Sequence, residues 1–547
     1  MSGLPAEGEE APAPTPSSTR NPQRTVTGAE NERKWVTFLA VGKDAWDPVE
    51  GLWRVSIGPS EWKAAQVGLS QTLHHRLASL WAELLEDGRI RLNSLWLGDG
   101  SCKGVHLFSE LPEAPFRLPS LLPEVPPALY FEREIAEMYG VEFAGSPDTR
   151  PLLLHERHSA PPMASPSATS TGERAPFSFP MTEGEGVYEI PVGPVHAGVI
   201  EPGHFRFQVV GEKILNLEVR LGYTHKGTER LFVGRDPSRG VLLAESISGD
   251  MSVAGGVAYL EAVESALGIT VTDPISAGRG LLLEVERIAF LLGDIAGIAL
   301  DVGYAAGAAQ ANVLRDQAYS VMEWLTGARL GRGTLSLGGW ARPLPAEAER
   351  PVRDSLRALG DHVASLHHHL VDRPSVVDRL RGTGVITRDV ATALGLVGPV
   401  ARASGLDRDV RRDRPRGPYR ETDVRVATRD TGDVEARLGV KVAEVVEAAR
   451  LALAMLDGGA LRPIRTGDAI SPSVPEGRRG LGLVESPRGE YLVAVRLDGE
   501  GRLARVHVRD PSFLNWPAIE YAVRGNIVPD FPLCNKSLNL SYSGFDR

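Results

Sequence analysis

A low-complexity segment in the middle of the chain constrains the fold most. It runs from about His158 to Gly186 and reads HSAPPMASPSATSTGERAPFSFPMTEGEG, rich in proline, serine and other small residues. Such a composition cannot build a packed core and favours an interdomain linker. A similar stretch at residues 1–33 predicts a disordered tail. The 547-residue chain is therefore predicted to hold two folded units, at residues 34–157 and 187–547.

The smaller unit mixes two kinds of pattern. Short β-like runs lie at Trp35–Val41, Leu52–Ile57 and Val105–Phe108, and the apolar residues of His74–Leu85 recur at helical spacing. Together these patterns predict a small α/β domain.

The larger unit combines hairpins with long helices. Alternating runs at His204–Val210 and Ile214–Leu221, and again at Tyr491–Leu497 and Leu503–Arg509, flank turn-like residues and predict hairpins. Helical periodicity covers Val257–Leu267, Arg279–Ile298, Ala305–Leu325, Pro351–Leu380 and Leu438–Leu456. The expected fold class is α+β, with a mostly helical body that carries small peripheral antiparallel sheets.

Composition excludes several classes of protein. The net charge of −10 argues against a general nucleic-acid binder, which needs clustered lysine and arginine. Two cysteines, Cys102 and Cys534, are too few for a disulfide framework or an iron–sulfur cluster. The N-terminus lacks a secretory signal, and the most apolar stretch, Gly280–Val313, contains five charged residues. We therefore expect a cytoplasmic protein that reaches any membrane through partners.

Nucleotide and zinc motifs of the usual kinds are absent from the sequence. A histidine cluster on one helical segment is the only metal-like composition: His362, His367, His368 and His369. His362 and His369 lie two turns apart, farther than one ion spans without another ligand, so a solvated helix face is the favoured interpretation.

A glycine-rich stretch at residues 193–230 is more informative, because polar residues are interleaved with its glycines. Glycine permits close backbone approach, and histidine and glutamate can relay protons. This pattern fits either a functional site or a sheet edge with satisfied polar groups. The polar residues are His196, Glu201, His204, Arg206, His225, Lys226 and Glu229.

Motifs in both units match one family, in the order in which the family carries them. Ile200–Phe207 and Leu221–Arg230 resemble the large subunit of energy-converting (group 4) nickel–iron hydrogenases, and its relative, the 49 kDa-type subunit of respiratory complex I. Tyr130–Val141 resembles the 30 kDa-type complex I subunit, which formate-hydrogenlyase-type large subunits carry fused in this order. Further matches lie at Leu283–Arg287, Gly395–Gly405, Asp409–Asp413, Ser486–Glu490, Asp510–Trp516 and Asp530–Arg547.

The sequence departs from the family at the metal site. Hydrogenases of this family hold nickel and iron with four cysteines, and soft thiolates suit such a redox-active pair. The resemblance places these ligands at Ser248, Met251, Ser541 and Gly544, none of which is a thiol, and Cys534 is not at a ligand position. We therefore expect no metal and no cofactor on this chain.

Two further departures concern processing and quinone. Nickel-carrying members are usually made with a C-terminal tail that is removed, whereas this sequence ends at Asp546-Arg547. The histidine and tyrosine with which the complex I subunit meets quinone align with Pro202 and Gly249. The resemblance thus argues against the usual quinone site, and a redesigned quinone pocket is the alternative.

Other site residues of the family are retained. Glu201 aligns with the glutamate that passes protons away from the metal, and Arg488 with the arginine above it. The aspartate that accompanies this arginine aligns with Asn539, so we expect that charge pair to be broken. Two interpretations of Glu201 and Arg488 stay open. Together with His204 and Met251 they could line a pocket that binds a small redox molecule. Alternatively, each is paired internally in a cavity that side chains fill.

The resemblance implies a membrane-associated, complex I-related oxidoreductase complex. Its expected partners are an iron–sulfur small subunit of the complex I 20 kDa type, antiporter-like and other membrane subunits, and no nucleic acid. In that complex the chain would take part in electron transfer or in coupling to membrane subunits that translocate ions. It would lie at the inner face of the cell membrane as a peripheral subunit. The alternatives are a quinone-reducing subunit and a purely structural scaffold.

Overall fold

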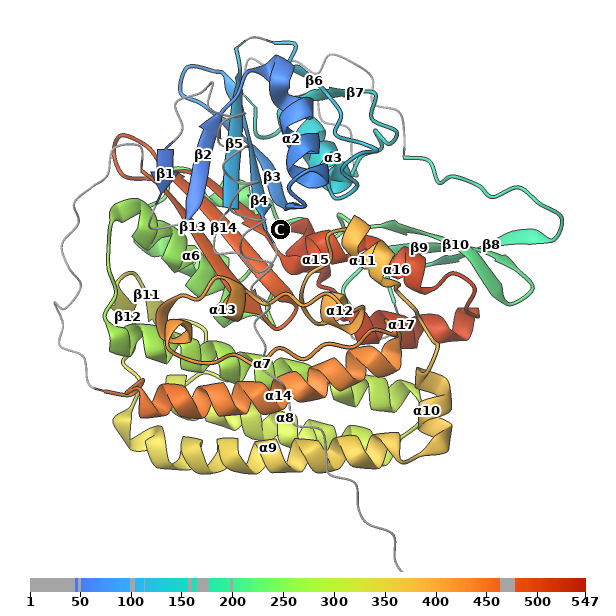
Figure 1. The fold of residues 1–547 in the computed structure, drawn as a ribbon, viewed down its shortest axis with the longest axis vertical. Helices are drawn as coiled ribbons and strands as arrows, with labels where there is room; N and C mark the ends of the chain where they lie inside the picture. The colour runs from blue at the N-terminus through green and yellow to red at the C-terminus, as the bar shows by residue number, and fades with distance from the viewer. Residues whose placement is uncertain are drawn as a thin grey trace, which may run out of the picture.

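The computed structural model describes residues 45–47, 51–98, 104–112, 114–155, 160–164, 177–196, 200–462 and 478–547 (Figure 1). A small α/β domain packs on a larger, mostly helical body that carries small sheets, which confirms the expected fold class. The predicted tail at residues 1–33 and the predicted strand at Trp35–Val41 lie outside the described residues.

The N-terminal domain is built on a five-stranded sheet with the order β1-β2-β5-β4-β3. Strands β2 and β5 pair in parallel, and the other neighbours are antiparallel. Helices α2 and α3 lie together on one side of the sheet (Figure 1). The bounds are β1 Ala45–Asp47, β2 Leu52–Ser56, α2 Trp62–Gln71, β3 Arg76–Leu84, β4 Ile90–Leu97, β5 Gly104–Leu111 and α3 Ala128–Tyr139.

The helix expected over His74–Leu85 is wrong, because this segment is strand β3. Seven consecutive residues of β3 are buried, since one face packs in the domain core and the other against the body. A strand buried on both faces loses its two-residue alternation, and its apolar positions then coincide with helical spacing.

Long helices form the body, in agreement with the helical patterns. Figure 1 shows α7, α8, α9 and α14 running side by side below the sheets. The pattern over Pro351–Leu380 divides into two helices, because Pro374 begins the second and cannot continue the first. The bounds are α6 Ser252–Leu267, α7 Asp273–Asp301, α8 Ala305–Thr326, α9 Glu349–Val371, α10 Pro374–Leu380 and α14 Val434–Asp457.

Two three-stranded antiparallel sheets complete the body, and both contain a predicted hairpin. One is formed by β8 Val187–Val192, β9 His204–Val210 and β10 Lys213–Arg220, and projects from the side of the molecule (Figure 1). The other is formed by β13 Arg479–Ser486, β14 Gly489–Leu497 and β15 Leu503–Arg509, and is largely buried. Neither β8 nor β13 was evident from periodicity.

The buried sheet joins the two domains. On one side α6 packs closely on β13, and on the other side β3 lies across the sheet. Arg76 pairs with Glu490, and the Ser79 hydroxyl lies 2.8 Å from Nε2 of His507. Arg509 donates to the Ala78 carbonyl. The N-terminal domain is therefore a structural support of the β13–β15 sheet.

Part of the predicted linker packs on the β8–β10 sheet. The guanidinium of Arg206 lies 4.1 Å from the ring centroid of Phe179, and that of Arg220 lies 4.4 Å from the centroid of Phe177. The domain limits at residues 157 and 186 stay predictions.

The remaining short elements connect these units. They are β6 Arg117–Pro119, β7 Glu142–Ala144, α4 Thr228–Phe232, α5 Val241–Ala244, β11 Leu335–Ser336, β12 Gly339–Trp340, α11 Arg388–Ala393, α12 Gly398–Ala403, α13 Val410–Asp413, α15 Pro511–Asn515, α16 Pro517–Ala522, α17 Phe531–Leu538 and α18 Tyr542–Asp546, with 3-10 turns at Pro59–Glu61, Pro237–Arg239, Ala346–Ala348, Gly417–Arg420 and Val528–Asp530.

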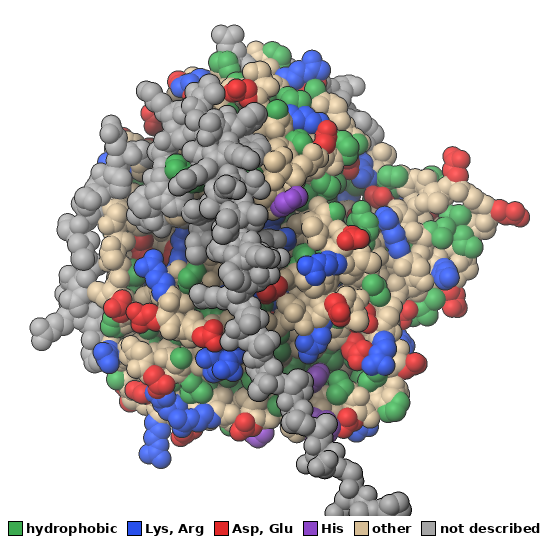
Figure 2. All heavy atoms as spheres, viewed as in Figure 1, with side chains coloured by type: hydrophobic (Ala, Val, Ile, Leu, Met, Phe, Trp, Pro, Cys, Tyr) green, Lys and Arg blue, Asp and Glu red, His purple; other side chains and the backbone are tan. Residues whose placement is uncertain are grey.

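Two features concern the surface of the protein and its relation to a membrane. Basic and acidic side chains are interspersed over the described part of the face in Figure 2. Within the described ranges, each helix is too short or too polar to cross a bilayer.

Candidate functional site

Three segments that are far apart in sequence meet at the predicted ligand positions. The first is the loop Ile247–Met251 between α5 and α6, and the second is the turn Pro487-Arg488 between β13 and β14. The third is the C-terminal stretch, in which Asn539 takes a left-handed φ of 45° and Ser541 caps α18. This convergence brings Ser248, Arg488 and Ser541 into contact.

The two serines at former ligand positions bind each other. The hydroxyl oxygens of Ser248 and Ser541 lie 2.9 Å apart, and Ser248 also donates to Asp250 at 2.8 Å. Ser541 accepts the backbone N–H of Gly544 at 2.9 Å, as a helix N-cap does. Both serines are 3% exposed, so these hydroxyls satisfy each other inside the protein.

The fourth position offers no side chain and no space for one. A Cβ atom added to Gly544 would collide with the Asp510 carboxylate, which is fully buried. Burial raises the pKa of Asp510, and its Oδ2 has no hydrogen-bond partner among the described residues. A carboxyl group therefore fills the volume next to this position.

Arg488 is paired, but not with the residue that aligns with the family's aspartate. Its guanidinium donates to both carboxylate oxygens of Asp250, at 2.9 and 2.8 Å, and lies 4.4 Å from the ring centroid of Phe290. Desolvation opposes ionisation of Asp250, yet Arg488 holds the pKa of this carboxyl below its usual value. The pair with position 539 is absent, in agreement with the expectation, and a different carboxylate pairs with Arg488. Asp250 replaces the lost partner, and Asn539 accepts from Arg488 only through its main-chain carbonyl.

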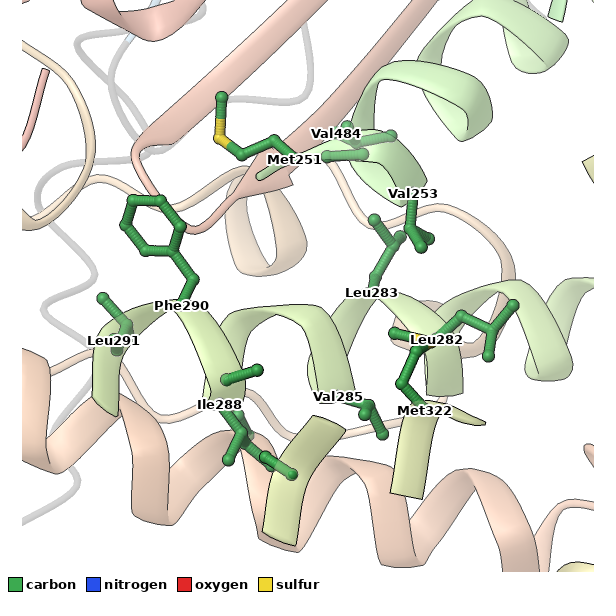
Figure 3. Packing of buried hydrophobic residues seen from close by; sticks show 14 of the residues in the cluster. Met251, Val253, Leu282, Leu283, Val285, Ile288, Phe290, Leu291, Met322 and Val484 are labelled. Carbon is green, nitrogen blue, oxygen red and sulfur yellow. The ribbon is translucent and has the colours of Figure 1, made fainter. Parts of the chain in front are cut away.

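The other predicted site residues lie in three different places. Glu201 accepts the backbone N–H of Ser543 at 3.1 Å, beside the serines. Met251 is buried in the hydrophobic core with Phe290 and Val253 (Figure 3). His204 begins β9, where its Nδ1 lies 3.3 Å from the Gly193 carbonyl and its ring faces Phe179. The structure therefore brings together Glu201, Ser248, Arg488, Ser541 and Gly544.

Two cations hold the Ile247–Met251 loop. Lys226 donates to the carbonyls of Ser246 and Ile247 at 2.8 and 3.1 Å, and Arg332 donates to the Gly249 carbonyl at 3.3 Å. A Cβ atom at Gly249 would lie 2.9 Å from Nη2 of Arg332. A guanidinium thus occupies space beside the position that aligns with the family's quinone-binding tyrosine.

The buried residue Glu286 binds the backbone directly after the Ile247–Met251 loop. The Glu286 carboxylate accepts the first backbone N–H groups of α6, from Val253 at 2.7 Å and Ala254 at 3.0 Å. Burial raises the pKa of Glu286 to about 8. This contact fixes the start of α6 directly after the loop.

The histidine cluster lies on the exposed side of α9. His362, His368 and His369 are exposed, and His368 pairs with Asp372 at 2.9 Å. Across the described ranges, His, Cys, Asp and Glu side chains form no group of three that could hold a metal ion. Cys534 is buried near Arg437, and Cys102 lies outside the described residues.

Sequence reasoning missed four residues of the site: Asp250, Ser543, Asp510 and Arg332. Asp250 and Ser543 each lie between two former ligand positions, so a polar side chain beside a lost ligand was an available signal. Nothing local in the sequence connects Asp510 or Arg332 with the site, because both arrive by tertiary packing.

Comparisons with known proteins define the class of this fold and site. Residues 301–468 and 466–547 match the family of the 49 Kd subunit of respiratory-chain NADH dehydrogenase, and residues 91–170 match that of its 30 Kd subunit. The chain therefore joins two types of complex I subunit in one polypeptide.

Two relatives from Escherichia coli match most of the chain. The chain is 33% identical to formate hydrogenlyase subunit 5 of Escherichia coli over 78% of its own length and 77% of the relative's. It is also 33% identical to hydrogenase-4 component G of the same organism, over 78% and 76%. It thus belongs to the family of group 4 hydrogenase large subunits related to complex I.

One solved structure has a similar fold. A chain of the membrane-bound sulfane sulfur reductase, an archaeal respiratory membrane complex, aligns with a TM-score of 0.62 and 26% identity. The alignment covers 68% of this chain and all of that one.

Proposed function

We propose that this chain is the large subunit of a membrane-associated oxidoreductase complex and works without a nickel–iron centre. The observation that carries this proposal is the direct hydrogen bond between Ser248 and Ser541, 2.9 Å long, at two former ligand positions. The chain then transfers electrons through its partners or couples them to ion translocation in the membrane.

The residues at the four positions do not fit a nickel–iron centre. Serine hydroxyls stay protonated near neutral pH, and here they are engaged with each other and with Asp250. Gly544 lacks a donor atom, and the Asp510 carboxylate fills the adjacent volume. Met251 is buried and belongs to a hydrophobic cluster (Figure 3). We therefore derive no chemistry from a metal at this site.

Relatives support the proposed assembly. They include the alpha subunit of a membrane-bound hydrogenase from Pyrococcus furiosus, 27% identical over 66% of this chain and 87% of the relative. By analogy, we propose that the chain binds an iron–sulfur small subunit beside the Ile247–Met251 loop. Antiporter-like membrane subunits would then hold the complex at the inner face of the cell membrane.

The second candidate is a quinone-reducing subunit with a redesigned pocket. It rests on similarity to an NADH-quinone oxidoreductase subunit of Roseiflexus castenholzii, 29% identical over 66% of this chain and 94% of the relative. Arg332 beside Gly249 and Pro202 at the histidine position weigh against the family's own quinone contacts.

Isolation of the complex from its native host, through a tag on this chain, tests the assembly. We expect an iron–sulfur small subunit and membrane subunits to copurify. Leu242 on α5, 59% exposed beside the loop, should belong to the contact, so Leu242→Glu should release the small subunit. Val313→Glu is the matched control, because Val313 is also 59% exposed but lies on the outer helix α8. Recovery of the chain alone, or loss of the partner in both variants, would refute the docking face.

A further inference from the structure

The coil before β8 lies along the outer face of the projecting β8–β10 sheet (Figure 1). Its burial alternates with a period of two, because Phe177 and Phe179 are half-buried whereas Ser178 and Pro180 are exposed. Residues two positions apart in an extended chain point to the same side, so both rings face the sheet. The two rings also contact each other, with their centroids 4.8 Å apart. We call residues Phe177–Thr182 the strap.

Guanidinium groups of the sheet and of the N-terminal domain contact the two rings of the strap. Arg206 of β9 lies 4.1 Å from the ring centroid of Phe179. Phe177 contacts Arg220 of β10 at 4.4 Å and Arg150 of the N-terminal domain at 5.3 Å. A guanidinium is attracted to the face of an aromatic ring, both through its charge and through planar stacking. The outer face of the sheet therefore prefers aromatic side chains to aliphatic ones.

The strap is held by side chains rather than by a backbone ladder. Its backbone forms no hydrogen bond with another backbone group of the described residues. Instead, the Ser178 carbonyl accepts from Arg150 at 3.4 Å, and the Pro180 carbonyl accepts from the Gln208 amide. Segments with few backbone hydrogen bonds and half-exposed side chains open locally at low free energy. We therefore expect the strap to leave the sheet more readily than its neighbours unfold.

The sheet retains its own core without the strap. Phe205, Phe207 and Leu217 point to its other face, where they are at most 1% exposed and pack in the hydrophobic core. The strands pair with each other through their backbones, in a register that places Arg220 opposite His204. Departure of the strap would therefore expose an intact surface.

We propose that the outer face of the β8–β10 sheet is a binding surface for extended aromatic segments, and that the strap is its internal ligand. The partner that fits is a segment of another protein chain with two aromatic side chains two positions apart. A proline directly after the second ring, as at Pro180, favours the extended conformation and lowers the entropy cost of binding. The strap and the partner segment compete, because both require Arg206 and Arg220.

The test is binding of a fluorescein-labelled peptide of residues 177–184 to the purified full chain, followed by fluorescence anisotropy. In the natural chain the strap occupies the surface, so the peptide should bind weakly. Phe177→Ser combined with Phe179→Ser releases the strap and should tighten peptide binding by about tenfold or more. Met181→Ala is the matched control, because Met181 lies on the same segment but is 74% exposed. It should leave peptide binding as weak as in the natural chain.

Two further measurements show whether the surface itself is responsible. A peptide with both phenylalanines replaced by alanine should not bind the double variant. Arg220→Ala, added to the double variant, should weaken binding of the original peptide about fivefold or more. Equal affinity of the peptide for the natural chain and the double variant, or equal binding of both peptides, overturns the proposal.

Fluorine NMR keeps the test decisive if the double variant does not fold. With 4-fluorophenylalanine in place of Phe179, an excess of unlabelled peptide should displace the strap. The fluorine resonance should then move to the position that the free, fluorinated peptide shows. A resonance that excess peptide leaves unchanged overturns the exchange. None of these measurements depends on the metal content of the chain, so the outcome is independent of the proposed function.

Discussion

At the scale of residues, a network of buried ion pairs connects the helices and the inner sheet of the larger domain. Three arginines and four carboxylates form one network between α7, α12, α13, α14 and β13, and all seven side chains are less than 5% exposed. Its members are Glu284, Arg287, Arg402, Asp409, Arg411, Glu444 and Glu485. Each charge is acceptable inside the protein only while its partners are present.

Arg402→Met should therefore destabilise the chain strongly. Arg402 pairs with Glu444, with Glu485 at 2.9 Å and with Asp409 at 3.4 Å, so its loss leaves buried carboxylates short of a partner. We expect the free energy of unfolding to fall by about 3–5 kcal/mol in urea denaturation. Arg329→Met is the control, because Arg329 and its partner Asp316 are 60% and 67% exposed, and it should cost less than about 1 kcal/mol. Equal losses would refute the role given to the network.

Glu286 should make stability depend on pH. Burial raises the pKa of Glu286 from its ordinary value of 4.5 to about 8. Between these values the folded chain binds more protons than the unfolded chain, so the free energy of unfolding falls as pH rises, by at most about 1.4 kcal/mol per pH unit. Glu286→Gln should remove this component from urea midpoints measured at pH 5.5 and 7.5. Parallel pH profiles in both proteins would contradict the assignment.

The sequence identified the site only in part at this scale. Ser248, Ser541, Gly544, Glu201 and Arg488 were predicted from their positions in family motifs, and the structure places them together. Asp250 could not be recognised as the partner of Arg488, because that pairing joins residues 238 positions apart. A lost charge partner can be replaced from another segment, and a comparison of aligned positions does not reveal this.

At the scale of elements, glycine decides how α6 meets the buried sheet. A Cβ atom at Gly480 would overlap the Ala262 carbonyl, and one at Gly482 would overlap the Ala258 carbonyl. These glycines let the backbone of β13 approach the backbone of α6, which begins directly after the site loop. The close packing therefore helps to fix the position of that loop.

Gly482→Ala should force α6 away from β13. Backbone atoms cannot yield as a flexible side chain can, so we expect a loss of about 3 kcal/mol or more in the free energy of unfolding. Gly360→Ala makes the same change inside α9, where nothing lies within 4 Å of the new Cβ atom, and should stabilise the chain by about 0.5–1 kcal/mol. Urea denaturation of both variants measures the difference. Tolerance of Gly482→Ala would refute the close approach.

Burial on several faces did not hide every element from the sequence. Helix α9 and the β9–β10 hairpin have one apolar face, whereas α6, α7 and the β14–β15 hairpin are buried almost throughout and were predicted from their length or from the turn residues between the strands. Strand β3 was mistaken for a helix, since it is buried on both sides between the domains. The second face of β3 is apolar because it contacts the other domain, and local sequence does not reveal that contact.

At the scale of the whole molecule, the N-terminal domain contacts and stabilises the turn between β13 and β14, which contains Arg488. Glu490 lies two residues after Arg488 and pairs with Arg76 of β3 and with Arg509. Burial disfavours its ionised form, yet the two arginines lower the pKa of Glu490 to about 2. The contact between the domains and the site turn therefore depends on a buried ion pair.

Arg76→Met should loosen this contact without unfolding either domain. We expect faster amide hydrogen exchange in β3 and in residues 486–490, by about tenfold to a hundredfold for a loss of roughly 1.4–2.8 kcal/mol. Arg117→Met is the control, because Arg117 and Glu142 are 65% and 57% exposed within the N-terminal domain. If both variants exchange like the natural protein, the domain does not brace the turn.

The central claim is that this family member works without nickel. Elemental analysis of the natively purified complex, expressed as nickel and iron per copy of this chain, tests it most directly. We predict iron from an iron–sulfur partner and no nickel. One nickel per chain would contradict the account, because the serines at positions 248 and 541 would then belong to a rebuilt metal site.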